Sequence, residues 1–392
     1  MLTLSVWFST AAVAPSISQE WGLVSHETSW LTMSVQIGFV VGALLSAAVN
    51  LADRVSPHAL MTAAALLAGS LTLMFAWVAP NLSVAIALRF LTGVALAGIY
   101  PVGVKVTASW FRQGRALAMG IMIGATALGS ATPHLITGFG APLPWRTLLT
   151  ATSVLCGVAA LIALMIREGP NRQERAPLRP GYLLDMFRDP AQRRVNLGYF
   201  GHMWELYGFW TWLPMYLTAS LVITQAQTSP DTALLEGQIE STVGMLSYLV
   251  IGICGAAGCV LAGIVAKKLG SCRVASWSLA MSGVCCVASI AVFGLSTWIL
   301  IPFLCVWGVS VVADSAQFSA ELSHKADPRY VGTALTLQMA VGFLITAVTI
   351  QIVPIIAAEF GWRWSFLVLA LGPLCGVLAM KKRSQLPVRQ RA

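Results

Sequence analysis

The sequence predicts an all-α polytopic membrane protein with twelve transmembrane helices. Of its 392 residues, 57% are hydrophobic and only 10% are charged, and the mean hydropathy is +0.77. A water-soluble domain cannot bury so large an apolar fraction. The apolar residues also fall into twelve stretches, each close to the ~20 residues that a helix needs to cross a bilayer.

The expected helices follow one another with short polar connections. Strands are a poor alternative, because the apolar stretches are too long and lack an alternation of period two. The twelve spans are expected at 2–17, 28–51, 58–78, 84–109, 116–136, 145–166, 195–217, 242–266, 274–293, 298–320, 333–358 and 364–380.

The first stretch differs from the others. It has only 16 residues, and no basic residue precedes it. Ala12-Val13-Ala14 resembles the cleavage site of a signal peptide, but the positive n-region is missing and Pro15 follows the site. These features favour a transmembrane helix whose start lies upstream.

Basic residues predict the orientation. Twenty of the 24 Lys and Arg residues lie in connections on one side of the membrane, if the N-terminus is on that side. Cytoplasmic loops carry such an excess, so both termini are expected in the cytoplasm of a cell (inner) membrane protein. The net charge of +9 follows from the same bias. Because no basic stretch is interleaved with stacking aromatic residues, nucleic acid is not an expected partner.

The chain contains an internal duplication. Residues 114–130 match 332–348 at an offset of 218, and Trp145-Arg146 match Trp362-Arg363 at nearly the same offset. Six spans per copy give both copies the same orientation, as in parallel repeats. The expected units are an N-terminal six-helix bundle at 1–166, a cytoplasmic linker at 167–194 with a short amphipathic piece at 182–187, a C-terminal six-helix bundle at 195–380 and a basic tail at 381–392.

With this organisation, the chain resembles the major facilitator superfamily of secondary transporters over nearly its full length. The family's loop motif, G-x-x-x-D-R-x-G-R-R, is matched between the second and third spans at Asp53 and Arg54, without its glycines. A degenerate copy between spans eight and nine has Lys267 in place of the acid, and Arg89 and Gly93 match the fourth-span pattern. The fifth-span pattern of antiporters is poorly matched. The resemblance implies alternating access, with Asp53 and Arg54 as gating residues.

Four ionisable side chains inside spans are the leading candidates for function: Arg89, His202, Glu205 and Asp314. A charge in the hydrocarbon costs at least ~2.5–3.5 kcal/mol, so such residues usually face a cavity or a partner. The Arg89 guanidinium suits a carboxylate or small oxyanion. Burial favours the protonated form of a carboxyl group, so Glu205 and Asp314 are the expected proton-coupling pair, with His202 in the same relay.

A structural alternative stays open for these residues. Arg89 could pair with Asp314 or Glu205 as a lock between helices, and His202 could donate to a backbone carbonyl. Lys105 lies near the cytoplasmic end of its span and can reach the headgroups.

Aromatic and amide residues complete the predicted solute site. Beside Arg89, the expected substrate-binding residues are Tyr100, Trp204, Tyr207 and Gln317. Trp210 and Trp212 are expected near the outer membrane interface, where tryptophan gathers.

No enzymatic site is expected, and no cofactor or metal. The eight cysteines form no C-x-x-C pair, and the sequence has no G-x-x-x-x-G-K-[ST] loop and no G-x-S-x-G elbow. The sequence and the resemblance predict a monomeric, proton-coupled secondary transporter of a small anionic solute, either an organic acid or an inorganic oxyanion, surrounded by membrane lipids. A proton-driven exporter of drugs or hydrophobic metabolites, and a membrane sensor or scaffold without transport, are the alternatives.

Overall fold

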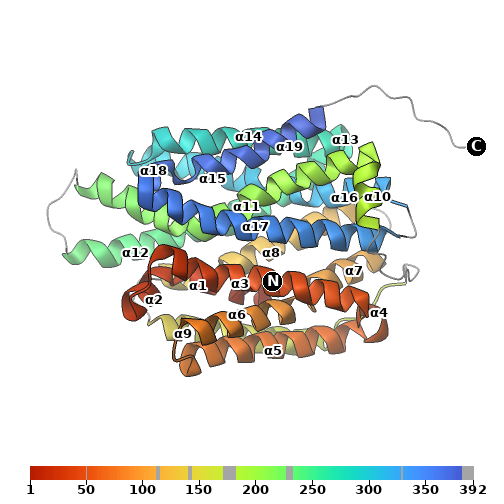
Figure 1. The fold of residues 1–392 in the computed structure, drawn as a ribbon, viewed down its shortest axis with the longest axis horizontal. Helices are drawn as coiled ribbons and strands as arrows, with labels where there is room; N and C mark the ends of the chain where they lie inside the picture. Colours follow the sequence, from red (N-terminus) through yellow and green to blue (C-terminus); the bar gives the residue numbers. More distant parts are fainter. Residues whose placement is uncertain are drawn as a thin grey trace, which may run out of the picture.

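The computed structural model describes residues 1–49, 51–111, 115–139, 144–170, 182–226, 233–327 and 330–381. These residues are almost entirely helical, and they contain no strand. Eleven of their helices are long and apolar enough to cross a membrane. The helices run roughly side by side along the long axis of the molecule (Figure 1). The predicted all-α membrane architecture is confirmed.

The first part of the chain forms one group of helices. Its short elements are η1 (Leu2–Val6), α1 (Ser9–Ala12), α2 (Ala14–Trp21) and α4 (Leu51–Arg54), and its long ones are α3 (Ser25–Ala48), α5 (Pro57–Val78), α6 (Leu82–Leu96), α7 (Tyr100–Trp110), α8 (Arg115–Gly138) and α9 (Trp145–Ala163). Within this group α3 packs on α6, and α5 packs on α6 and α9.

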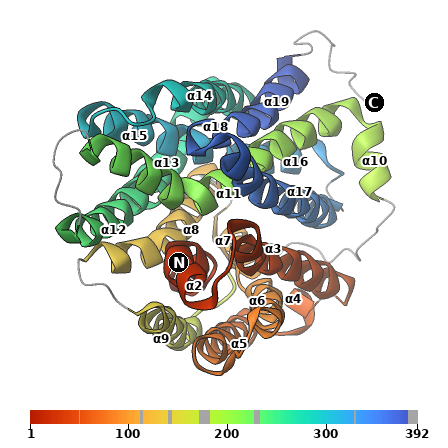
Figure 2. The same cartoon turned by 60° about the vertical axis from the view of Figure 1, so that its left-hand side comes forward.

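The second part begins at α10 (Tyr182–Arg188), where the amphipathic piece was expected. It continues with α11 (Pro190–Ala226), α12 (Ala233–Ser247), the π-helical turn η2 (Tyr248–Cys254), α13 (Gly255–Leu269), α14 (Ser271–Val292), α15 (Thr297–Ala313), α16 (Ser315–Lys325), α17 (Val331–Phe360), α18 (Trp362–Ser365), η4 (Leu367–Ala370) and α19 (Leu371–Lys381). The two parts occupy different sides of the molecule and meet where α3 lies against α17 and α8 against α12 and α13 (Figure 2).

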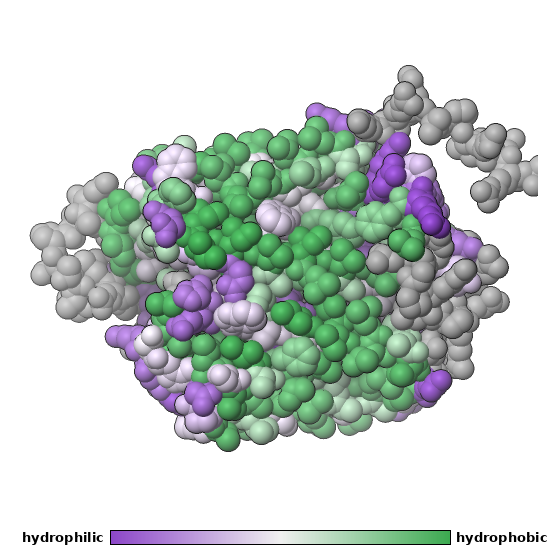
Figure 3. Space-filling view, viewed as in Figure 1, coloured by the Kyte–Doolittle hydropathy of each residue, from purple (hydrophilic) through white to green (hydrophobic). Residues whose placement is uncertain are grey.

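The molecule has two polar ends. The connections near α4 and α10 and the end of α19 lie at one of them, which we call the linker end; α2 and the tip between α17 and α18 lie at the other, the opposite end (Figure 1). Apolar residues form a broad band between them, and hydrophilic residues gather toward the ends (Figure 3). This distribution fits a protein that spans a bilayer.

The first predicted span is not one helix. Residues 2–17 form a 3₁₀ turn and two short α-helices, with non-helical backbone angles at Phe8 and Val13. Pro15, in the first turn of α2, has no N–H to donate to the preceding turn, which accounts for the second of these breaks. Gly22 then ends α2 with φ of 65°, a conformation that glycine adopts without a steric penalty.

The fourth and tenth predicted spans are interrupted at corresponding positions. The fourth divides into α6 and α7 at 97–99, and Pro101 explains this because it cannot donate to the carbonyl of Ala97. The tenth divides into α15 and α16 at Asp314. Positions 97 and 315 differ by the repeat offset of 218. Both halves therefore break the corresponding helix near mid-span.

Arg89, on α6, holds the interrupted N-terminal segment in place. Its side chain is fully buried. Nη1 donates to the carbonyl of Val6 (2.8 Å), Nη2 to the carbonyl of Trp7 (2.8 Å) and to Oγ1 of Thr10 (3.4 Å), and Nε to the carbonyl of Leu31 on α3 (3.1 Å). Two of these carbonyls lie at the break between η1 and α1, where the chain is not helical. Arg89 thus supplies hydrogen bonds that a continuous helix would make within itself.

This arrangement predicts that Arg89 stabilises the fold even without solute. Arg89→Ala removes these donors. The carbonyl of Leu31, inside α3, and that of Val6, which also accepts from the Ser9 hydroxyl (2.9 Å), keep other partners, so the main loss is at the carbonyl of Trp7, at about 1–3 kcal/mol. We expect the apparent Tm of the detergent-solubilised protein to fall by about 5 °C or more. Arg273→Ala, at an exposed position of α14, is the matched control and should leave Tm nearly unchanged. A normal Tm for Arg89→Ala together with lost solute binding would instead show that Arg89 acts in solute binding and not in stabilising the fold.

Candidate functional site

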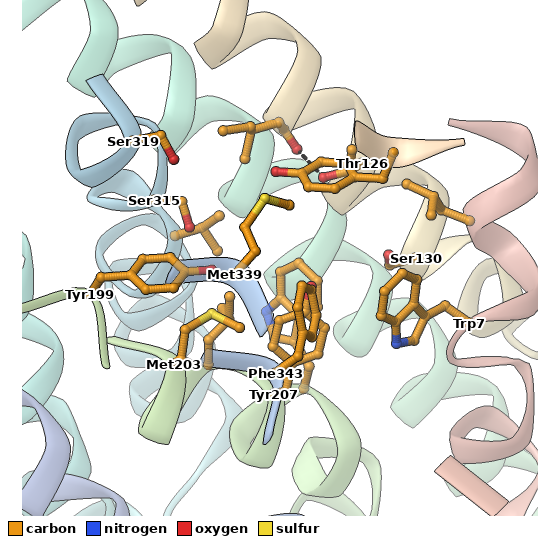
Figure 4. A pocket seen from close by; sticks show the side chains of 16 residues that line it. Trp7, Thr126, Ser130, Tyr199, Met203, Tyr207, Ser315, Ser319, Met339 and Phe343 are labelled. Carbon is orange, nitrogen blue, oxygen red and sulfur yellow. Dashed lines mark hydrogen bonds between the residues drawn. The ribbon is translucent and has the colours of Figure 1, made fainter. Parts of the chain in front are cut away.

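A cavity lies between the two groups of helices, which both contribute side chains to it (Figure 4). Its volume is about 50 Å³. Small-molecule sites usually measure ~300–1,000 Å³, so this cavity must expand before it can hold an organic solute. It is lined by Leu4, Trp7, Tyr100, Ile123, Thr126, Ser130, Tyr199, Met203, Leu206, Tyr207, Trp210, Val312, Ser315, Ser319, Met339 and Phe343.

The described lining residues include no Lys, Arg, Asp or Glu. Their polar groups are mainly hydroxyls, from three tyrosines and from Thr126, Ser130, Ser315 and Ser319, together with two tryptophan N–H groups. The remaining surface is aromatic and aliphatic. Such a wall can surround an apolar body and hydrogen-bond to a few polar atoms, but it carries no fixed charge of its own.

A buried ionisable pair adjoins this wall. His202 on α11 and Asp314, between α15 and α16, are each 1% exposed, and Nδ1 of His202 lies 2.8 Å from Oδ1 of Asp314. The other ring nitrogen, Nε2, is 2.7 Å from Oγ of Ser315, which lines the cavity. The structure thus brings two predicted proton-coupling residues together, one hydroxyl away from the cavity.

Glu205, the third predicted coupling residue, occupies a separate place. One carboxylate oxygen accepts from the indole N–H of Trp307 (2.7 Å) and from the Cys286 thiol (3.2 Å), and the other accepts from the Ser282 hydroxyl (2.8 Å). These donors lie on α14 and α15, within the second group of helices. Glu205 is buried and does not line the cavity.

The predicted substrate-binding residues divide into two sets. Tyr100 and Tyr207 line the cavity. Trp204 faces away from it and donates to the carbonyl of Val368 (3.0 Å). Gln317 is buried on α16 outside the lining, and its amide has no hydrogen-bond partner among the described residues.

Arg89 does not face the cavity in this conformation. The prediction of a solute contact and the alternative of a lock to Asp314 or Glu205 both required a negative partner. The hydrogen bonds described for Arg89 go instead to three backbone carbonyls and one threonine hydroxyl. The sequence could not indicate this, because the carbonyls of Val6 and Trp7 become available only through the break between η1 and α1.

The residues expected at the ends and interfaces lie as follows. Arg54 is exposed at the end of α4, while the side chain of Asp53 lies outside the described residues. Lys105 is 30% exposed, 3.5 Å from Glu168. Trp210 and Trp212, expected near the outer interface as belt or packing residues, are 4% and 3% exposed and pack inside the protein rather than facing outward.

Sequence reasoning missed several of the residues that surround these groups. Trp7 was hidden in an apolar stretch, although it lines the cavity. Ser315 and Ser319 both follow Asp314 and are four residues apart, a helical spacing that could have indicated a hydroxyl-lined face. Trp307 looked like any lipid-facing tryptophan. The described residues contain no group of three His, Cys, Asp or Glu that could hold a metal ion.

Comparison with known proteins gives related transporters. The family described as the Major Facilitator Superfamily matches residues 1–350. A probable sulfoacetate transporter of Cupriavidus necator is 24% identical over 255 residues, 60% of this chain and 59% of that protein. A 4-hydroxybenzoate transporter of Pseudomonas putida is 24% identical over 322 residues, 70% of each chain. Another 4-hydroxybenzoate transporter, from Pseudomonas aeruginosa, is 26% identical over 282 residues, 61% of this chain and 60% of that protein.

The matched part of the chain spans about three fifths of the length of the first and third of these relatives. The family match covers most of the chain, including the N-terminal segment, both interrupted spans and the cavity-lining helices α8 and α11. Helical architecture, membrane-length spans and this match agree with the resemblance of the loop motifs. The chain is therefore a multi-pass membrane protein that belongs to the major facilitator superfamily of transporters.

Proposed function

We propose that this protein is a proton-coupled transporter of a small organic anion, working by alternating access. The observation that carries the proposal is the His202–Asp314 pair, held one hydroxyl away from an otherwise uncharged cavity between the two groups of helices. The relatives give independent support, since sulfoacetate and 4-hydroxybenzoate are both organic anions.

Charge balance provides the coupling mechanism. With His202 neutral and Asp314 ionised, the pair carries one negative charge, which repels an anion at the adjacent wall. One proton taken up by the pair makes it neutral overall and removes that repulsion. In a medium of low dielectric constant such interactions are strong, so anion and proton bind best together. This is the thermodynamic basis of symport.

The cavity size supports alternating access. At about 50 Å³ the cavity is too small for a solute, so binding requires the two groups of helices to separate. The breaks near Ala97 and Asp314 lie beside the cavity and give the interrupted helices places to bend. We propose that Arg54, with Asp53, acts at the linker end as a gating residue.

For location, we propose the inner membrane of a bacterium with the linker end in the cytoplasm. Among the described residues, most of the basic side chains belong to elements at the linker end, which matches the positive-inside rule.

A hydrophobic exporter is the second candidate. The absence of a cationic side chain among the described lining residues favours it, because a permanent cation would be expected for tight anion binding. Substrate preference separates the two: an exporter of this kind would prefer lipophilic cations or neutral compounds. A sensor or scaffold would bind solute without moving it across proteoliposome membranes.

The orientation can be tested with two matched cysteines. In a variant without the eight native cysteines, Glu359→Cys at the opposite end should react with an impermeant maleimide in intact cells. Lys268→Cys at the linker end should react only after permeabilisation, because it would lie in the cytoplasm. Both positions are exposed, so access depends on the side of the membrane. The reverse labelling pattern would refute the proposed topology.

The coupling assignment can be tested with two carboxyl-to-amide changes of equal size. Asp314→Asn should abolish accumulation driven by a proton gradient but preserve exchange of preloaded solute, because the pair can no longer exchange its proton. Glu205→Gln should retain most accumulation, since the amide oxygen can still accept from Trp307, the amide NH2 group can donate to the Ser282 hydroxyl, and no cavity group changes. The measurement is uptake of radiolabelled 4-hydroxybenzoate and sulfoacetate into proteoliposomes, with uptake into protein-free liposomes subtracted.

Protein yield and Tm of both variants serve as controls for folding. If Asp314→Asn accumulates either solute normally while Glu205→Gln does not, Glu205 is the coupling group and the assignment is wrong. If the unmodified protein transports neither these acids nor any other small anion, the proposed substrate class fails.

A further inference from the structure

Six aromatic side chains meet beside the cavity and join the two groups of helices. We call them the aromatic cluster: Trp7 and Phe8 from the N-terminal segment, Phe39 from α3, Tyr207 and Trp210 from α11, and Phe343 from α17. Trp7, Tyr207, Trp210 and Phe343 line the cavity itself. Figure 4 shows Trp7 entering from one group of helices and Tyr207 and Phe343 from the other.

Direct contacts between these rings cross the boundary. The Phe8 and Tyr207 rings are stacked with centroids 5.5 Å apart, and the Trp7 and Phe343 centroids are 5.4 Å apart. Phe39 and Phe343 are closer still, at 4.7 Å. When the two groups of helices separate to admit a solute, such contacts must be lost. A ligand that offers a planar ring can replace them, whereas an aliphatic ligand of the same volume cannot replace their ring–ring geometry.

The cluster also contains unused hydrogen-bond donors. The indole N–H groups of Trp7 and Trp210 are buried, and neither has a hydrogen-bond partner among the described residues. An indole nitrogen can only donate. A buried donor without a partner is costly, so these groups favour a ligand that brings acceptor oxygens. A carboxylate on an aromatic ring has both required parts.

We infer that the cavity selects an aromatic carboxylic acid over an aliphatic one, with the ring held between the Trp7, Tyr207 and Phe343 side chains and an oxygen near an indole N–H. This inference rests on the proposed transport of organic anions and specifies the kind of anion. It distinguishes between the substrates named for the relatives, one an aromatic carboxylate and the other an aliphatic sulfonate.

The test compares two acids that differ only in the ring, benzoate and cyclohexanecarboxylate, and adds sulfoacetate, a ringless acid that also carries a sulfonate group. Benzoate, cyclohexanecarboxylate and sulfoacetate are titrated into the purified full-length protein by calorimetry. We expect benzoate to bind at least about tenfold more tightly than cyclohexanecarboxylate, because each aromatic contact contributes a factor of roughly two to ten. Phe343→Leu should bring this ratio close to one. Phe75→Leu, the same change in a buried cluster away from the cavity, should preserve it.

A second variant isolates the donor. Trp7→Phe keeps an aromatic ring but removes the N–H, and it should weaken benzoate binding about fivefold or more. Trp298→Phe, at a position 89% exposed, is its matched control. Equal affinity for benzoate and cyclohexanecarboxylate in the unmodified protein would overturn the inference, as would tighter binding of sulfoacetate. Failure of all three acids, and of other small anions, would instead overturn the proposed function.

Discussion

The membrane leaves no water to pair with backbone groups, and this constraint determines where the charged residues of the protein lie. A chain that interrupts its helices in the hydrocarbon must find other hydrogen-bond partners for the carbonyl groups that it frees. The N-terminal segment is interrupted at Phe8, and Arg89 donates to the carbonyls of Val6 and Trp7 on the preceding turn. Because Trp7 lines the cavity, the same guanidinium that satisfies the backbone also fixes one wall of the proposed solute site. A buried cation can therefore shape a binding site without touching its ligand.

The second half of the chain has a buried polar contact of its own, although α11 is one continuous helix. Trp307 is separated from Arg89 by the repeat offset of 218. In one half Arg89 donates to the carbonyl of Val6, and in the other Trp307 donates to the carboxylate of Glu205. Both contacts tie the cavity-lining segment to the helix behind it. This correspondence supports a holding role for Glu205 and leaves the His202–Asp314 pair, which has a route to the cavity through Ser315, as the proposed site of proton exchange.

Much of the fold could be predicted from the sequence. The length of the apolar stretches located the membrane helices, the basic loops indicated an orientation, and the internal repeat indicated two halves. The sequence also identified the buried ionisable residues, since any such residue in an apolar stretch stands out. It could not predict their partners. Arg89 appeared to need an anion because the break at Phe8 is not evident from residue types, and Glu205 and Asp314 looked alike because both are acids in apolar helices. For Trp210 and Trp212 the sequence could not separate bundle packing from exposure at a lipid interface, because tryptophan is common in both places. What distinguishes these cases is which residues on distant helices contact one another, and a single sequence does not contain that information.

The lack of a cation in the described cavity lining has a consequence for release. A transporter must bind its solute on one side and let it leave on the other, so a permanent Arg–carboxylate contact would slow the second step. In the proposed mechanism, an uncharged wall of hydroxyl and aromatic groups binds an organic acid moderately, and the neighbouring His202–Asp314 pair changes that affinity with one proton. Loss of the proton would then restore a negative charge beside the bound anion and favour its release. Release of the solute is therefore faster if Arg89 does not contact it, and the hydrogen bonds of Arg89 to the backbone hold its side chain away from the cavity.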